Sequence, residues 1–121
     1  MERIADFMSS PVLCIDAQST AEEGAKQMCD KNITSLLVKE QQEYVGIITL
    51  TDLVKRVVAK GLDPKSTKLF SLMSKPLISM GHRMPRTEAN DLMFTKKIKH
   101  LAVTREGSIV GILTTKDMMT G

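Results

Sequence analysis

The hydrophobic and polar positions follow the same order twice along the chain. Short apolar runs, typical of buried strands, alternate with stretches in which apolar residues recur every three or four positions, typical of an amphipathic helix. In the first half, a Thr20-x-x-Glu23 capping box opens the helical stretch. The pattern predicts a short strand, a helix, two strands and a final helix in each half, in the order β-α-β-β-α.

The predicted elements match between the halves. The strands are expected at Val12–Ile15, Ser35–Lys39 and Val45–Thr49, and again at Leu77–Met80, His100–Thr104 and Ile109–Thr114. The loops between paired strands are expected at Gln41–Glu43 and Glu106–Ser108, and the final helices begin at Thr51 and Thr115. A short helical lead-in, Ile4–Met8 or Leu69–Met73, precedes each half and stops before a proline.

An internal repeat explains this symmetry. When the chain is shifted by 65 residues against itself, fourteen positions are identical, among them "MS-P", "I--L-V" and "VGI-T--D". We interpret residues 1–60, with the lead-in helix, as repeat 1, residues 61–68 as a linker, and residues 69–121 as repeat 2 with a short last helix. One repeat buries little by itself. We therefore expect an α+β fold in which two repeats pack sheet to sheet, with clefts between them for small ligands.

Composition narrows the class of protein. The chain has 121 residues, of which 42% are hydrophobic and 26% charged, which is typical of a globular domain. No apolar run could span a bilayer, and the N-terminus has acidic residues where a signal peptide needs an apolar stretch, so we expect a cytoplasmic protein. The net charge of +3 suits an anionic ligand. One Tyr, three Phe and no Trp make nucleic acid possible but not favoured.

The Thr-x-x-Asp motifs are the main candidates for chemistry. Thr49 and Asp52, like Thr114 and Asp117, stand where a strand runs into a helix. The carboxylate could accept two hydrogen bonds from the cis-diol of a ribose, and the Thr hydroxyl and helix N–H groups suit a phosphate. The same spacing fits an ordinary helix N-cap box. The two interpretations are compatible.

The turns from helix to middle strand are a second candidate. Backbone groups near Ile33 and Thr34, or near Ile98, Lys99 and His100, could read an adenine edge. Lys99 and His100 add positive charge in repeat 2 alone, although they also fit a solvated basic patch. No metal-ligand spacing, activated nucleophile or paired carboxylate occurs, which predicts neither a metal site nor catalysis.

The repeated motifs M-S-x-P, I-x-x-L-x-V and V-G-I-x-T-x-x-D resemble those of CBS domains, here as a tandem pair or Bateman module. The resemblance implies a pseudo-two-fold pair whose two clefts bind adenosyl ligands: AMP, ADP, ATP or S-adenosylmethionine. It implies no further cofactor. It also implies a homodimer that regulates a fused or partner protein, which agrees with apolar residues on the last helices, namely Val54, Val57, Val58, Met118 and Met119.

The family's binding positions can be carried over to this chain. One cleft would use Thr114 and Asp117 together with Thr20, Ile33 and Thr34 from the other repeat. The mirror cleft would use Thr49 and Asp52 with Met80, Ile98 and Lys99, and Lys99 and His100 match positions that often hold phosphates. The leading hypothesis is a non-catalytic adenine-nucleotide sensor. The alternative is a CBS pair that binds nucleic acid or protein without a nucleotide.

Overall fold

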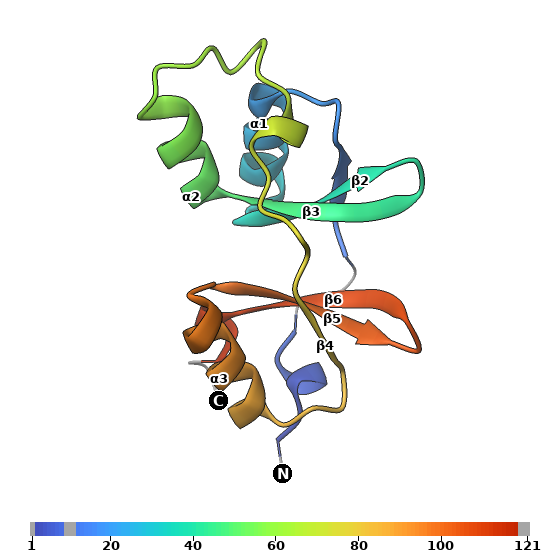
Figure 1. The fold of residues 1–121 in the computed structure, drawn as a ribbon. Helices are drawn as coiled ribbons and strands as arrows, with labels where there is room; N and C mark the ends of the chain where they lie inside the picture. The colour runs from blue at the N-terminus through green and yellow to red at the C-terminus, as the bar shows by residue number, and fades with distance from the viewer. Residues whose placement is uncertain (1, 9–11, 119–121) are drawn as a thin grey trace. The chain divides into compact units, whose positions relative to one another are not determined.

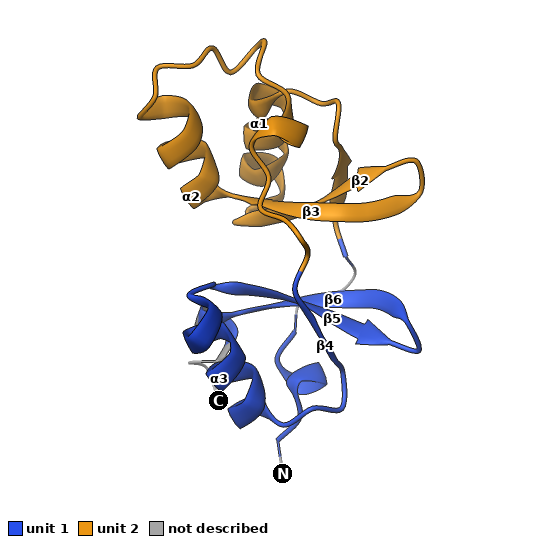
Figure 2. Ribbon diagram, in the orientation of Figure 1, with its two compact units in different colours: residues 1–12, 78–121 blue, residues 13–77 orange. Residues whose placement is uncertain are grey.

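The chain folds into two compact units, each with one three-stranded sheet and its own helices. The computed structural model describes residues 2–8 and 12–118, without the side chains of positions 116 and 118. One unit comprises residues 13–77, and the other comprises residues 1–12 and 78–121 (Figure 2). Both units are α+β, which confirms the predicted fold class at the level of the repeat. The sheet-to-sheet packing of the units stays a prediction.

The unit of residues 13–77 has its helices on one face of its sheet (Figure 1). Its elements are β1 (Cys14–Asp16), α1 (Ala21–Lys31), β2 (Ser35–Glu40), β3 (Glu43–Thr49), α2 (Leu50–Leu53), the π-helical turn η2 (Val54–Val58) and the 3-10 turn η3 (Leu69–Ser71). Strand β2 is central, parallel to β1 and antiparallel to β3. Alternate residues of β2, Leu36 and Val38, pack with Met28 of α1 in the core.

The other unit repeats this plan. Its elements are η1 (Ile4–Asp6), β4 (Ser79–Gly81), α3 (Arg86–Lys96), β5 (His100–Arg105), β6 (Ser108–Thr114) and α4 (Thr115–Met118). Strand β5 is central, parallel to β4 and antiparallel to β6. Leu101 and Val103 of β5 pack with Met93 of α3, as their counterparts do in the first unit. The order β-α-β-β-α is therefore confirmed in both halves.

The two long helices begin differently and end alike. Thr20 caps α1 through the predicted box with Glu23, whereas Pro85 precedes α3 with no side-chain cap. Both helices end at a left-handed residue, Asn32 with φ 54° and Lys97 with φ 56°. Each of these two helices has 11 residues. In the described part of the chain, no helix is long and apolar enough to cross a membrane.

The loops between paired strands are shorter than predicted. Glu40 pairs with Glu43, and Arg105 pairs with Ser108, so that two residues rather than three make each turn. Both turn residues have positive φ in each hairpin: 48° and 76° in the first, 51° and 83° in the second. A two-residue turn with positive φ at both positions matches the right-handed twist of the strands. Each hairpin is therefore one residue pair longer than predicted.

The last helix of repeat 1 begins at Leu50, one residue earlier than predicted, because Thr49 caps it. Its second half is a π-helical turn in which Ala59 N donates to the Val54 carbonyl at 2.8 Å. Val57 is buried in the core, so its inclusion in the apolar face predicted for a homodimer was wrong. Val54 and Val58 are exposed, as the predicted homodimer contact requires. The side chain of Met118, and Met119 entirely, lie outside the described residues.

The lead-in segments cross between the repeats. Ile4 of repeat 1 donates its N–H to the Met84 carbonyl at 3.0 Å and is buried in the core of the repeat 2 elements. Leu69 of repeat 2 donates to the Ser19 carbonyl at 2.9 Å and is buried in the core of the repeat 1 elements. The compact units therefore differ from the sequence repeats 1–60 and 69–121. Each core is completed by an apolar side chain from the other repeat.

Candidate functional site

Both Thr-x-x-Asp motifs form helix caps. Thr49 N donates to Asp52 Oδ2 at 3.0 Å, and Asp52 N donates to Thr49 Oγ1 at 3.1 Å. Thr114 N donates to Asp117 Oδ2 at 3.0 Å, and Asp117 N donates to Thr114 Oγ1 at 3.1 Å. The capping interpretation is therefore realised in both repeats. In these bonds each cap engages Oδ2 of the aspartate, so the chemistry of the site depends on what meets the other oxygen.

The second oxygen of Asp52 faces groups of its own unit. Arg56 Nε lies 3.8 Å from Asp52 Oδ1, and Ser74 Oγ lies 3.5 Å from the same atom. Arg56 is itself held by the Leu72 carbonyl, to which its Nη1 donates at 2.8 Å. Asp52 is 8% exposed. A ribose diol would therefore have to displace Arg56 and Ser74 to reach this carboxylate.

A cavity of about 540 Å³ adjoins these groups. It is lined by Arg56, Phe70, Ser71, Met73, Ser74 and Lys75, all from the unit of residues 13–77. Lys75 Nζ lies 5.0 Å from the centre of the Phe70 ring. Two cations, two hydroxyls and one aromatic ring make the cavity suitable for an anionic group. Positive charge near a Thr-x-x-Asp motif is therefore not confined to repeat 2, contrary to the expectation from sequence.

Asp117 has a different setting. It is half-buried at the start of α4, beside the end of β6. The position that corresponds to Arg56 under the 65-residue shift is Gly121, which has no side chain. The adjoining turn has Lys99 and His100 where repeat 1 has Thr34 and Ser35. The two aspartates are equivalent as caps but not in their surroundings.

The helix-to-strand turns lie beside the Thr-x-x-Asp motif of their own unit. Leu50 N donates to the Thr34 carbonyl at 3.1 Å, and Thr115 N donates to the Lys99 carbonyl at 3.0 Å. His100 pairs with Thr114 across the ladder. The predicted residues Ile33, Thr34, Ile98, Lys99 and His100 therefore each lie near a motif. Ile33 and Ile98 pack against the cores, and their N–H groups donate to the carbonyls of Met28 and Met93, which leaves their own carbonyls as the candidates for binding.

Thr20 and Met80 are not brought to these turns. Thr20 lies at the opposite end of α1 from Ile33, and an 11-residue helix is about 16 Å long. Its hydroxyl accepts from Glu23 N at 3.2 Å and donates to Glu23 Oε1 at 3.1 Å. Met80 pairs with Val103, three residues beyond the start of β5, and packs against the core. The grouping of Thr20 with Ile33, and of Met80 with Ile98, in one cleft stays a prediction.

The helix cap formed by Thr20 and Glu23 also shifts the pKa of Glu23. The backbone N–H of Thr20 donates to the Glu23 carboxylate, and its hydroxyl adds a second hydrogen bond. These bonds favour the charged form and lower the pKa of Glu23 below its usual value. Thr20 and Glu23 thus form the cap at the beginning of α1.

Arg56, Ser74 and Lys75 were missed by sequence reasoning. Arg56 follows Asp52 by four positions, which places the two on one helix face, and this spacing was a usable signal. Ser74 belongs to the repeated "MS-P" motif. Its contact with Asp52 follows from the crossing of the lead-in, which no local pattern shows. Among residues 2–8 and 12–118, no group of three or more His, Cys, Asp or Glu could hold a metal ion.

Comparison with known proteins identifies the family. The model described as "CBS domain" matches residues 4–59 and again residues 69–120. The chain belongs to the CBS domain family. The two matches coincide with the internal repeat, so this is a tandem CBS pair, and such pairs are generally regulatory modules that commonly bind adenosyl ligands.

Individual relatives agree. Uncharacterized protein MK0525 of Methanopyrus kandleri is 37% identical over 102 residues, covering 83% of this chain, which spans 52% of that protein. CBS domain-containing protein YhcV of Bacillus subtilis is 29% identical, with 98% of this chain and 84% of that protein covered. The chain therefore spans about half the length of one relative and most of the other.

Solved structures show the same fold. A hexameric CBS-CP12 protein from bloom-forming cyanobacteria has a TM-score of 0.92 and 25% identity, with 99% of this chain and 70% of that chain covered. An uncharacterized conserved protein from Pyrococcus horikoshii has a TM-score of 0.89 and 28% identity, with 97% and 89% covered.

Proposed function

We propose that this CBS pair is a non-catalytic sensor of adenosyl ligands, of the AMP, ADP, ATP or S-adenosylmethionine class. Asp117 anchors the ribose, Thr114 and the N–H groups at the start of α4 lie near the phosphate, and Lys99 or His100 supplies positive charge. The observation that carries the proposal is the cap itself. It holds a carboxylate and a hydroxyl together at a helix start in both repeats, next to backbone groups of the adjoining turn.

The basic residues of the adjoining turn support Asp117 as the stronger anchor. Lys99 and His100 stand there where repeat 1 has Thr34 and Ser35. Asp52 Oδ1, by comparison, is approached by Arg56 and Ser74. Displacing Ser74 and Arg56, whose side chain is 46% exposed, from Asp52 Oδ1 has a free-energy cost that a ligand at Asp52 must offset. We therefore expect one tight site per chain. A second, weaker site at Asp52 would rely on Arg56 and Lys75 for the anionic group.

The test is calorimetric titration of the full chain with AMP, ATP and S-adenosylmethionine. Asp117→Ala should lower the affinity of the preferred ligand by about 1.5–3 kcal/mol, roughly 10- to 150-fold, because a charged acceptor is lost. Asp117→Asn keeps an oxygen for the cap but removes the negative charge, so it should bind almost as weakly while it unfolds like the parent. Asp91→Asn, exposed on α3, makes the same change in net charge and should bind like the parent.

Thermal unfolding of each variant separates the two roles of the aspartate. A cap alone is worth about 0.5–2 kcal/mol of stability and would leave affinity unchanged. If Asp117→Asn binds AMP and ATP as tightly as the parent, the carboxylate is a cap and the site assignment is wrong. If none of the three compounds raises the melting temperature of the parent, the sensor proposal itself fails, because a ligand of the native state must stabilise it.

A further inference from the structure

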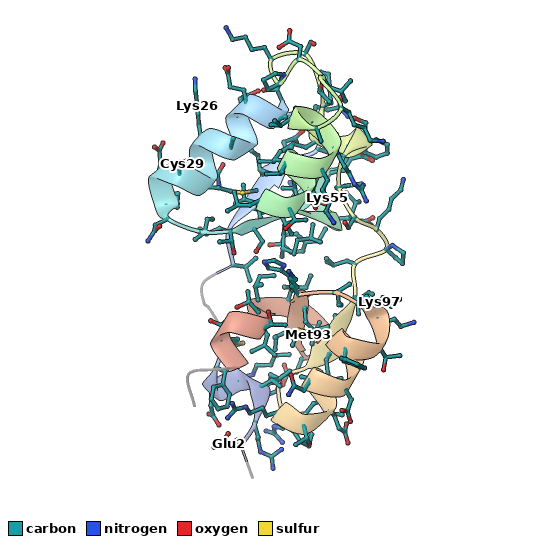
Figure 3. The ribbon with its side chains drawn as sticks, turned by 90° about the vertical axis from the view of Figure 1, so that its left-hand side faces the viewer. Glu2, Lys26, Cys29, Lys55, Met93 and Lys97 are labelled. Atoms are coloured by element: carbon teal, nitrogen blue, oxygen red, sulfur yellow. The ribbon has the colours of Figure 1, made fainter. Side chains whose placement is uncertain are left out.

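A second cavity lies on the helical side of repeat 2, along the last two turns of α3. Its volume is about 470 Å³, within the range of small-molecule sites. Met93, Phe94 and Ile98 supply apolar walls, and Lys97 and Lys99 supply two cations. Met93 and Lys97 are labelled on α3 in Figure 3. All lining residues belong to the unit of residues 78–121, so the cavity is a property of that unit.

The side chains around this cavity differ between the two repeats. The residue that corresponds to Thr115 under the 65-residue shift is Leu50, whose larger side chain is 43% exposed. The backbone is the same at both positions, since Leu50 N and Thr115 N each donate to the carbonyl of the preceding turn.

Two further residues that line the cavity differ from their counterparts in repeat 1. Phe94 stands where repeat 1 has Cys29, and it is 87% exposed, an unusual state for an aromatic side chain. Lys97 stands where repeat 1 has Asn32. Repeat 2 thus has an aromatic ring, Phe94, and a cation, Lys97, beside one cavity, where repeat 1 has Cys29 and Asn32.

The shape and charge of the cavity indicate its ligand. Asn90 and Met93 lie on one face of α3 and Lys97 caps its end, so the three span about 10 Å along the helix axis. The lysines lie at one end of this stripe, and none of the described lining residues is acidic. A ligand with an apolar body about 10 Å long and a negative group at one end would match both features.

We propose that this cavity binds an anionic amphiphile, namely a free medium-chain carboxylate, with its chain along Met93, Phe94 and Ile98 and its head group at Lys97 and Lys99. The exposed apolar stripe of a second copy is a poor alternative occupant. That stripe, Leu50 and Val54, is followed by Lys55, so lysines would face lysines. The cavity shares Lys99 with the proposed adenosyl site, but neither Thr114 nor Asp117 lines it, so the proposal does not require adenosyl binding.

The experiment is titration of the isotope-labelled full chain with decanoate, below its micelle concentration, followed by amide and methyl NMR. We expect saturable shifts confined to the second half of α3, Ile98–Lys99 and Thr115. Decyltrimethylammonium has the same tail with the opposite charge and should bind more weakly. Thr115→Leu copies the residue of repeat 1 and should abolish saturable binding without unfolding the chain, because Leu50 occupies the same backbone position in repeat 1.

A pair of lysine variants tests whether Lys97 binds the carboxylate head group of decanoate. Lys97→Asn copies repeat 1, where Asn32 has the same left-handed conformation, and should weaken decanoate by about two- to five-fold. Lys60→Asn makes the same charge change at an exposed position of repeat 1 and should have no effect. Unsaturable or scattered shifts would overturn the proposal, and so would undiminished binding to Thr115→Leu. Shifts at the same residues that depend on protein concentration without decanoate would assign the cavity to a second copy instead.

Discussion

Replacement of Leu69 by Ala tests the crossing of the lead-in segments. Leu69 is fully buried in the core of the unit of residues 13–77, although it belongs to repeat 2 in sequence. Its methyl carbons lie 3.3 and 3.4 Å from where a Cβ on Gly24 would be. Truncation would leave a void against a residue that has no side chain with which to fill it.

The magnitude follows from this geometry. Leu→Ala at buried sites costs about 2–5 kcal/mol, and the cost is larger where the surroundings cannot relax into the cavity. Because Gly24 offers backbone alone, we expect about 3–4 kcal/mol for Leu69→Ala. That is a large part of the 5–15 kcal/mol typical of a domain of this size. Leu62→Ala, at a leucine 44% exposed, should cost less than about 1 kcal/mol and is the matched control.

Urea unfolding measures the cost, and native-state hydrogen exchange locates it. Protection should fall more in α1, β2 and β3 than in α3, β5 and β6, because Leu69 completes the first core. Gly24→Ala should recover more stability in the Leu69→Ala background than in the parent, where its Cβ would press on Leu69. The reasoning is refuted if Leu69→Ala costs no more than Leu62→Ala, or if the loss of protection concentrates in α3, β5 and β6.

Two further predictions concern acid stability and assembly. The pKa of Glu23 is lowered in the folded state, so the stability from its cap is fully present above the usual Glu pKa and is lost as the pH falls through the lowered value. The difference in unfolding free energy between the parent and Glu23→Gln should therefore shrink on acidification. Glu106→Gln, at an exposed position, is the control. A difference for Glu23→Gln that stays constant with pH and equals that of the control would contradict this. Val54 and Val58, 57% and 73% exposed, should form part of a homodimer contact. Light scattering should then show a dimer that Val54→Glu weakens roughly tenfold or more and Lys55→Glu does not; a monomeric parent, with and without AMP, would remove the claim.

The repeat, the order of elements and the caps could be predicted from the sequence because each depends on neighbours close along the chain. Apolar periodicity separates strands from helices, and Thr-x-x-Asp defines a helix start whatever surrounds it. The two-residue hairpins were missed because Gln41 and Gln42 are unusual in a turn that needs positive φ at both positions. In that case the pairing of the strands overrides the weak local preference of the turn residues.

The tertiary structure alone decided which core receives each lead-in. Ile4 and Leu69 are both apolar, and the two cores are built from homologous residues, so no local preference distinguishes the exchanged arrangement from the unexchanged one. The exchange in turn brings Ser74 to Asp52. The cavity along α3 likewise depends on the approach of Thr115 to α3 and Ile98, from which it is separated in sequence. Composition and spacing specify what each segment forms, whereas contacts between distant segments determine which of these residues meet.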